Sequence, residues 1–432
     1  MSTPDHGSPE HPDGVVQLCS DLIRIDTSPA GNGERAAAEF VAAELSGMGL
    51  EPELFEHLPR RSSVVARLGG TDPARPALLV QMHLDVVAAD AAAWSVPPFS
   101  GEVDDGQVWG RGAVDMKDMV AMVITALRLK LASGWRPTRD IVVALLADEE
   151  MGGREGAGWL VEAHPDLFEG CREAIGEAGG FSHELGDGRR AYFVQIAEKG
   201  ITWLRLAAHG QGGHGSLIHA GNPIAKLAEA VLRVQRYVPP HRASESTQAA
   251  VAAARGWTGE QDPDSAFDAV GPVGRLLRPT LRNTFSITRL AAGVQHNVVP
   301  FRAEASIDGR FVPGYETELL AEIRQLVGDL VDVEVVHAGR AVQTSFDGAT
   351  PDAIRAAIEK EDPGATVVPT CLPIGTDGKH FDRLGIRNFG FVPLLLPAGY
   401  DFASMFHGVD ERVPVSSLAA GVRILQSFFD EC

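Results

Sequence analysis

Apolar runs of strand length alternate with amphipathic helical segments along the first part of the chain. The largely apolar stretches 77–85 and 140–150 have the length of strands that are covered on both faces, as in a parallel sheet. The segment 116–134 instead places Val120 and Leu127 on one helical face. Strands that alternate with helices in this way predict an α/β fold built on a doubly wound, mostly parallel sheet.

The pattern changes between residues 198 and 342. There the predicted elements follow the order β-α-β-β-α-β, which is the ferredoxin-like arrangement, with a helical insertion at about 240–280. The doubly wound pattern then resumes. We therefore expect a discontinuous catalytic domain at 15–197 and 343–432, interrupted by a small α+β lid or dimerisation domain, and a disordered, polar and proline-rich tail at 1–14.

Composition narrows the class of protein. The 432 residues are 44% hydrophobic and 22% charged, as in ordinary globular proteins, and the formal net charge is -20. Nucleic acids and anionic membrane surfaces are therefore not expected as partners, because both require basic patches. The four cysteines are scattered without a CxxC motif, and no long apolar segment or secretory leader is evident. We expect a cytoplasmic protein.

Ionisable residues follow the ends of several predicted strands and loops. His83 and Asp85 close one apolar strand, and residues two apart in a strand point to the same side. In open α/β sheets this carboxyl-terminal edge is where ligands bind. The further residues expected at this edge are Asp115, Glu149, Glu150, Glu177 and His407. Imidazole and carboxylate donors without thiolate suit Zn²⁺, and also Mn²⁺ or Co²⁺.

Each of these residues also has a structural explanation when it is considered alone. His83 and Asp85 could form a buried hydrogen-bonded pair, and Asp115 could cap the helix that follows it. The pair Glu149–Glu150 could begin a helix, Glu177 could be a solvated loop residue, and His407 could be a structural histidine. Their joint occurrence at matching positions favours a metal site.

Several short motifs carry a resemblance to a known family. In chain order they read HLDVV, PPFSG, GRGAVDMK, ADEEMGG, GEAGG, GGHGS, HNVVP, GTDGKHF and HGVDERVP. This order resembles the two-metal aminoacylase and carboxypeptidase family, which includes glutamate carboxypeptidase, succinyl-diaminopimelate desuccinylase and acetylornithine deacetylase. The resemblance extends over nearly the whole chain from about residue 15, and the family has the two-domain architecture predicted above. The PPFSG and GTDGKHF stretches favour the branch of aminoacylases and broad-specificity carboxypeptidases.

The resemblance implies two divalent ions, with Zn²⁺ preferred. One ion is expected at His83, Asp115 and Glu177, and the other at Asp115, Glu150 and His407, so that Asp115 bridges them. Asp85 is expected to orient His83, as the usual hydrogen-bonding partner of a metal-bound imidazole. Glu149 matches the general base, and a cis peptide bond is expected between Asp115 and Met116.

The resemblance also implies hydrolysis of an amide next to a free carboxylate. Asn297 and Arg310 match residues that hold this carboxylate or the reacting carbonyl, and the backbone at Gly375 and Thr376 is expected to assist. His214 is expected to stabilise the oxyanion of the other subunit in a homodimer formed through the lid domain. The apolar residues of 389–397 are expected to be core rather than an acyl pocket.

Two alternatives stay open from the sequence. The substrate could be a dipeptide or a peptide with a free carboxyl terminus instead of an N-acyl amino acid. The chain could also be a catalytically silent scaffold that binds a metal or ligand, although a scaffold has no use for the spare carboxylate of Glu149.

Overall fold

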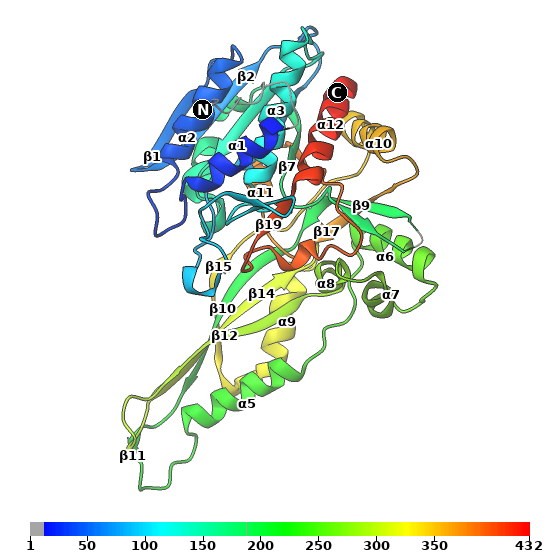
Figure 1. Ribbon diagram of the computed structural model, residues 1–432. Coiled ribbons are helices and arrows are strands. Elements are labelled where there is room, and N and C mark those ends of the chain that lie inside the picture. Colours follow the sequence, from blue (N-terminus) through cyan, green and yellow to red (C-terminus); the bar gives the residue numbers. More distant parts are fainter. Residues whose placement is uncertain (1–12, 187) are drawn as a thin grey trace. The chain divides into compact units, whose positions relative to one another are not determined.

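The computed structural model describes residues 13–186 and 188–432 (Figure 1). It divides into two compact units. Unit 1 comprises the described residues up to Ile196 together with Thr344–Pro369 and Thr376–Cys432, and unit 2 comprises Ala197–Gln343 and Thr370–Gly375. The predicted tail lies outside the described residues except for its last two positions, which already belong to helix α1 (Asp13–Arg24).

Unit 1 is built on one large mixed sheet. The strands follow the order β1 (Glu53–Leu58), β2 (Arg61–Leu68), β6 (Ile141–Leu146), β3 (Ala77–His83), β7 (Cys171–Gly176), β18 (Arg387–Gly390) and β9 (Arg190–Glu198). The four central strands, β6, β3, β7 and β18, run parallel, whereas β1, β2 and β9 pair antiparallel. The predicted doubly wound, mostly parallel sheet is thus confirmed for its centre.

Every residue of β3 and β6 is buried, as in strands that are covered on both faces of a sheet. Helices α1, α3 (Lys117–Ala132), α12 (Val415–Glu431) and α10 (Ala349–Glu361) pack side by side in that order (Figure 1). Phe168 and Phe381 pack with Leu79 and Val142 in one hydrophobic core. The further helices are α2 (Arg35–Gly47), α4 (Trp159–Ala163), α11 (Gly378–Phe381), and the short turns η1 (Ala91–Ala93), η2 (Glu149–Met151), η3 (Arg154–Gly158), η4 (Pro165–Phe168), η7 (Asp382–Leu384) and η8 (Phe402–Ser404).

The segment 389–397 belongs to this core. Phe389, Phe391 and Leu394 are buried. Its apolar side chains therefore fill the interior, as expected. The remaining strands are β17 (Thr366–Leu372) and β8 (Ser182–Glu184), which pair with β9, and a small sheet of β4 (Glu102–Asp104), β5 (Gln107–Trp109) and β19 (Arg412–Pro414).

Unit 2 contains a four-stranded antiparallel sheet in the order β12 (Thr284–Ala292), β14 (Arg302–Phe311), β10 (Gly200–His209) and β15 (Asp332–Ala338). Helices α5 (Pro223–Arg236) and α9 (Glu316–Val327) pack on it, and buried residues alternate with less buried ones along β14. The chain order β10-α5-β12-β14-α9-β15 is the predicted β-α-β-β-α-β arrangement. Other elements of the unit are β11 (Gly213–His214), α6 (Glu245–Thr258), α7 (Pro263–Val270), α8 (Gly274–Leu277), η5 (Arg278–Leu281), β13 (Val298–Val299), η6 (Gly328–Leu330) and β16 (Val342–Gln343).

Among the described residues, no helix has the length and apolar character needed to cross a membrane.

Candidate metal centre

The parallel strands of unit 1 deliver several acidic residues and a histidine to one edge of the sheet. His83 is the last residue of β3, Glu149 and Glu150 follow β6 in η2, and Glu177 follows β7 directly. Since β6, β3 and β7 are parallel neighbours, their carboxyl ends lie together. Asp115, two residues before α3, and His407, in the loop before β19, join them.

The first donor set forms around His83. Its Nε2 atom lies 3.1 Å from Asp115 Oδ1 and 3.3 Å from Glu177 Oε2. The Nδ1 atom lies 2.9 Å from the backbone oxygen of Asp85, an acceptor, so Nδ1 carries a proton and Nε2 is the ring nitrogen that a metal ion could bind in place of a proton. Glu177 Oε1 is buried and has no hydrogen-bond partner among the described residues. The arrangement brings His83 Nε2 together with carboxylate oxygens of Asp115 and Glu177.

The second donor set forms around His407. Its Nε2 atom lies 3.4 Å from Asp115 Oδ2 and 3.0 Å from Glu150 Oε2. Asp115 therefore directs one carboxylate oxygen to each histidine, as a bridging ligand does. The peptide bond between Asp115 and Met116 is cis, in agreement with the sequence expectation.

These separations fit divalent ions. Two ligand atoms about 2.0–2.2 Å from a tetrahedral ion stand about 3.3–3.6 Å apart. The four donor pairs, two in each set, span 3.0 to 3.4 Å, so modest movement would admit an ion between them. His83, Asp115 and Glu150 also form one group whose donor atoms all lie within 4.8 Å, and His83, Glu149 and Glu177 form another.

Ion pairing shapes the ionisation of these side chains. Burial alone would raise the pKa of Asp115, but hydrogen bonds with His407 and His83 hold it well below its usual range. The same contacts with Asp115 and Glu150 raise the pKa of His407 to about 10. Burial raises the pKa of Glu177. Without an ion, the centre therefore holds protonated imidazole against carboxylate, and a metal ion would take the place of those protons.

The carboxylate of Asp85 makes contacts that differ from the sequence expectation. Its Oδ1 lies 3.7 Å from His83 Nδ1, too far for a hydrogen bond, and the backbone carbonyl of Asp85 orients the ring instead. The two carboxylate oxygens accept hydrogen bonds from the backbone N–H groups of Glu149, at 3.1 Å, and Glu150, at 3.0 Å. Asp85 thus fixes the turn that carries both glutamates.

In that turn the side chains of the two glutamates point in different directions. Glu150 reaches His407, whereas Glu149 lies in the group with His83 and Glu177 and is buried. Burial raises the pKa of Glu149 well above its usual value, and the charge of Glu177 adds to this shift. A buried carboxylate with a raised pKa beside a metal centre has the character of a general base.

Residues that the sequence reasoning did not single out support the centre. Glu411 accepts hydrogen bonds from Arg111 Nη1, at 2.6 Å, and from the backbone of Val114, at 2.7 Å. Arg111 also donates to the carbonyl of Gly408, at 2.9 Å. This buried pair joins the loop before Asp115 to the loop after His407. The sequence contained a clue to this pair, since Arg111 lies in the motif GRGAVDMK and Glu411 lies in the motif HGVDERVP.

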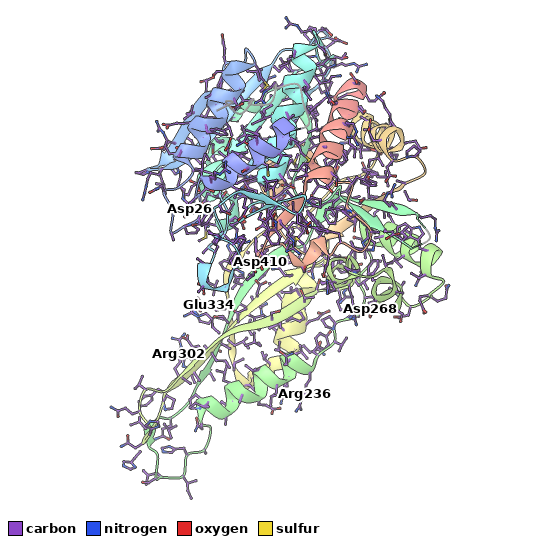
Figure 2. All side chains as sticks on the ribbon, viewed as in Figure 1. Asp26, Arg236, Asp268, Arg302, Glu334 and Asp410 are labelled. Atoms are coloured by element: carbon purple, nitrogen blue, oxygen red, sulfur yellow. The ribbon has the colours of Figure 1, made fainter. Side chains whose placement is uncertain are left out.

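A second contact of the His407 loop is made by Asp410, which is labelled in Figure 2. Its carboxylate accepts hydrogen bonds from the backbone N–H and the hydroxyl of Ser95, both at 2.7 Å. Ser95 belongs to the loop that precedes PPFSG. The loop is thereby held at Asp410 as well as at the adjacent Glu411.

The predicted substrate-binding residues lie mostly in unit 2. His214 is exposed on β11, and its Nδ1 accepts a hydrogen bond from the backbone of Ser216 at 3.2 Å, which leaves the proton on Nε2. The carbonyl of Asn297 accepts from Gly215 at 2.7 Å, so these two loops are adjacent. Arg310 makes a two-pronged ion pair with Asp308, at 2.6 and 3.0 Å.

Two further predicted residues lie on the segment that crosses from unit 2 back to unit 1. Gly375 ends the unit 2 portion, and Thr376 begins the last portion of unit 1. Thr376 is buried, and its hydroxyl accepts a hydrogen bond from the backbone of Gly378 at 3.0 Å. The role of His214 at the oxyanion and the roles of the four substrate-binding residues stay predictions.

The fold and the paired donor sets define a class of protein, the hydrolases with a two-metal centre at the edge of an α/β sheet. Residues 79–431 match the model of peptidase family M20/M25/M40. The chain belongs to this family, which confirms the resemblance derived from the motifs, and it is a hydrolase of that family.

Similar proteins agree with this assignment. The chain is 27% identical to aminoacylase-1 of Sus scrofa over 423 residues, covering 96% of this chain and 94% of the relative. It is 28% identical to the probable carboxypeptidase S-like 2 of Dictyostelium discoideum over 397 residues, covering 82% and 71%. The crystal structure of the M20 family metallo-carboxypeptidase Sso-CP2 from Sulfolobus solfataricus superposes with a TM-score of 0.73 at 19% identity, covering 96% and 98%, which establishes the fold.

Proposed function

We propose that the protein hydrolyses the amide bond of an N-acyl amino acid or short peptide next to a free carboxylate. The observation that supports this most directly is the pair of donor sets that share the two oxygens of Asp115, with buried Glu149 beside them. An aminoacylase and a carboxypeptidase are both among the relatives, so a dipeptidase or carboxypeptidase specificity is the second candidate.

In this proposal His83, Asp115 and Glu177 hold one ion, and Asp115, Glu150 and His407 hold the other. Zn²⁺ fits the nitrogen and oxygen donors, and Co²⁺ or Mn²⁺ could replace it. Two such ions, when bound, supply a water of lowered pKa and polarise the reacting carbonyl.

The side chains of the chain itself perform the proton transfers. Glu149 accepts a proton from the attacking water and delivers it to the nitrogen of the leaving amine. Glu150 cannot share this role, since its Oε2 faces His407 in the second donor set. His214 donates a hydrogen bond from Nε2 to the developing oxyanion. Arg310 exchanges its ion pair with Asp308 for a two-pronged ion pair with the substrate carboxylate.

Because His214 lies on an exposed turn of unit 2, we propose that it acts in the site of the partner subunit of a homodimer formed through unit 2. Mixing a His214→Ala subunit with a Glu149→Gln subunit should restore activity in part, because one site of the mixed dimer is then complete. Mixed dimers that form and stay inactive would rule out action across subunits.

We also propose a cytoplasmic location. The four cysteines are all free and buried, which suits a reducing compartment.

The decisive test of the reaction is Glu149→Gln, assayed with acetyl-amino acids and dipeptides in the presence of Zn²⁺ or Co²⁺. We expect full metal content by elemental analysis and a rate lower by about 10²–10⁴-fold, as for loss of a general base. Unchanged activity would refute the role of Glu149. Loss of one ion would instead show that Glu149 is a metal ligand, and the roles assigned to Glu149 and Glu150 would have to be exchanged.

A further inference from the structure

Helix α11 contacts the far end of the turn that carries Glu149. Asp85 holds the amino-terminal part of this turn, at the amides of Glu149 and Glu150. Its carboxyl-terminal part, Gly152 and Gly153, lies against α11 instead. His380 Nε2 lies 2.9 Å from the carbonyl of Gly152 and donates a hydrogen bond to it. Burial lowers the pKa of His380 to about 4, so the ring is neutral and the donor is a single N–H group.

Two glycines, Gly153 and Gly158, make this approach possible. A Cβ atom on Gly153 would lie 1.9 Å from Asp377 Oδ1 and 3.1 Å from His380 Nε2. A Cβ atom on Gly158 would lie 3.1 Å from the ring of His380, although the φ of Gly158 is -59°, an ordinary helical value. A Cβ atom there would also lie 3.0 Å from the carbonyl oxygen of Gly153, so the absence of a side chain at Gly158 serves the close approach of His380 and the turn, and not the local backbone conformation. Gly152 and Gly153 also have positive φ, which lets the turn close.

Asp377, which precedes α11, is an unusual group in this contact. It is fully buried, and neither carboxylate oxygen has a hydrogen-bond partner among the described residues. Burial raises the pKa of Asp377 to about 8. A buried carboxyl without a partner is costly, and such costs persist mainly at functional sites.

We propose that α11 fixes the turn of Glu149 from its carboxyl-terminal side, with His380 and Asp377 as positioning residues for the general base. The proposal rests on the proposed function of Glu149. His380 holds the carbonyl of Gly152, and Asp377 packs against Gly153, so that the turn is fixed at both ends, by Asp85 at one and by α11 at the other.

Paired variants test the proposal. His380→Leu removes the donor to Gly152, whereas His380→Gln keeps an N–H donor in a similar place. Gly158→Ala presses a methyl group onto both His380 and the carbonyl of Gly153. Gly47→Ala is the matched control, because Gly47 ends helix α2 in the same unit and a Cβ atom there would meet open space. All variants are assayed at saturating metal concentration for kcat, KM and metal content.

We expect kcat to fall about tenfold to hundredfold in His380→Leu, Asp377→Ala and Gly158→Ala, the size of effect that a 1 Å misplacement can cause. KM and metal content should change little, while His380→Gln should recover most of the loss and Gly47→Ala should behave as wild type. A kcat within twofold of wild type in both His380→Leu and Asp377→Ala overturns the proposal.

Amide hydrogen exchange of residues 148–153 separates this proposal from the proposed function. The exchange should accelerate in His380→Leu and Asp377→Ala and stay unchanged in Gly47→Ala, whatever the substrate is. If Glu149→Gln retains activity while exchange responds as expected, the role of Glu149 is wrong and the contact of α11 still stands. Unchanged exchange in both α11 variants overturns the inference on its own.

Discussion

Replacing Asp85 distinguishes two explanations of an aspartate beside a metal-binding histidine. The sequence suggests that Asp85 orients His83, whereas in the structure its carboxylate binds the amides of Glu149 and Glu150. Asp85→Ala removes both acceptors. A buried N–H group left without a partner costs about 1–3 kcal/mol. The Glu149 amide is buried and the Glu150 amide is partly buried, so we expect a loss of about 2–4 kcal/mol in the free energy of unfolding.

The assay is urea unfolding of the metal-free protein, together with kcat and metal content of the loaded protein. Asp85→Asn keeps one acceptor oxygen and should lose about half as much stability. The control is Asp90→Ala, because Asp90 accepts a single exposed backbone N–H, from Ala92 at 3.1 Å, and should cost no more than about 1 kcal/mol. We expect kcat of Asp85→Ala to fall because the turn of Glu149 is released.

The competing explanation gives a different result. If Asp85 acted through His83, metal affinity would fall about 10–100-fold while the metal-saturated enzyme kept its kcat and its stability. That outcome would refute the role assigned to Asp85 from the hydrogen bonds.

The remaining predictions concern the metal centre. Chelation should abolish activity and Zn²⁺ or Co²⁺ should restore it, and Asp115→Ala should lose both ions by elemental analysis, whereas retention of two ions would contradict the bridging role. In the metal-free protein, the pKa of His407 is raised to about 10, compared with about 6.5 in the unfolded chain. Protonated His407 therefore stabilises the fold fully below pH 6.5, and this contribution should disappear as pH rises through about 10. The urea unfolding midpoints of wild type and His407→Gln should converge there. Glu411→Ala leaves Arg111 buried without its partner and should cost about 3–5 kcal/mol in urea unfolding, and a cost below 1 kcal/mol would show that the pair does not hold the His407 loop.

The sequence predicted the centre because its residues follow parallel strands. Apolar runs fix the ends of β3, β6 and β7, and parallel neighbours present those ends at a common edge, so His83, Glu150 and Glu177 could be grouped without coordinates. Asp115 and His407 follow no strand, and they were placed in this group from their positions next to long loops, whereas the family resemblance assigned the ion that each would bind. The roles assigned to these residues stay predictions.

The contacts that the sequence could not predict depend on the path of the backbone. The two-residue alternation places Asp85 on the same side as His83, but it says nothing of the amides that a loop 64 residues away brings to the carboxylate. The partner of Arg310 was within reach of the same rule, since Asp308 is two residues away on β14 and shares its face. Strand β1 was missed because it is largely exposed and carries no apolar pattern.

The chain order of the ligands has a consequence for how the protein matures. His83, Asp115 and Glu177 all precede unit 2, whereas His407 follows it. During synthesis, the first donor set is complete before unit 2 emerges from the ribosome, and the second set has to wait until that unit has been made. The two positions could therefore be filled at different times, the first on a nascent chain and the second only on the finished protein. Metal starvation would then leave a population of chains with an ion at the first set alone, where Asp115 would contribute a single oxygen.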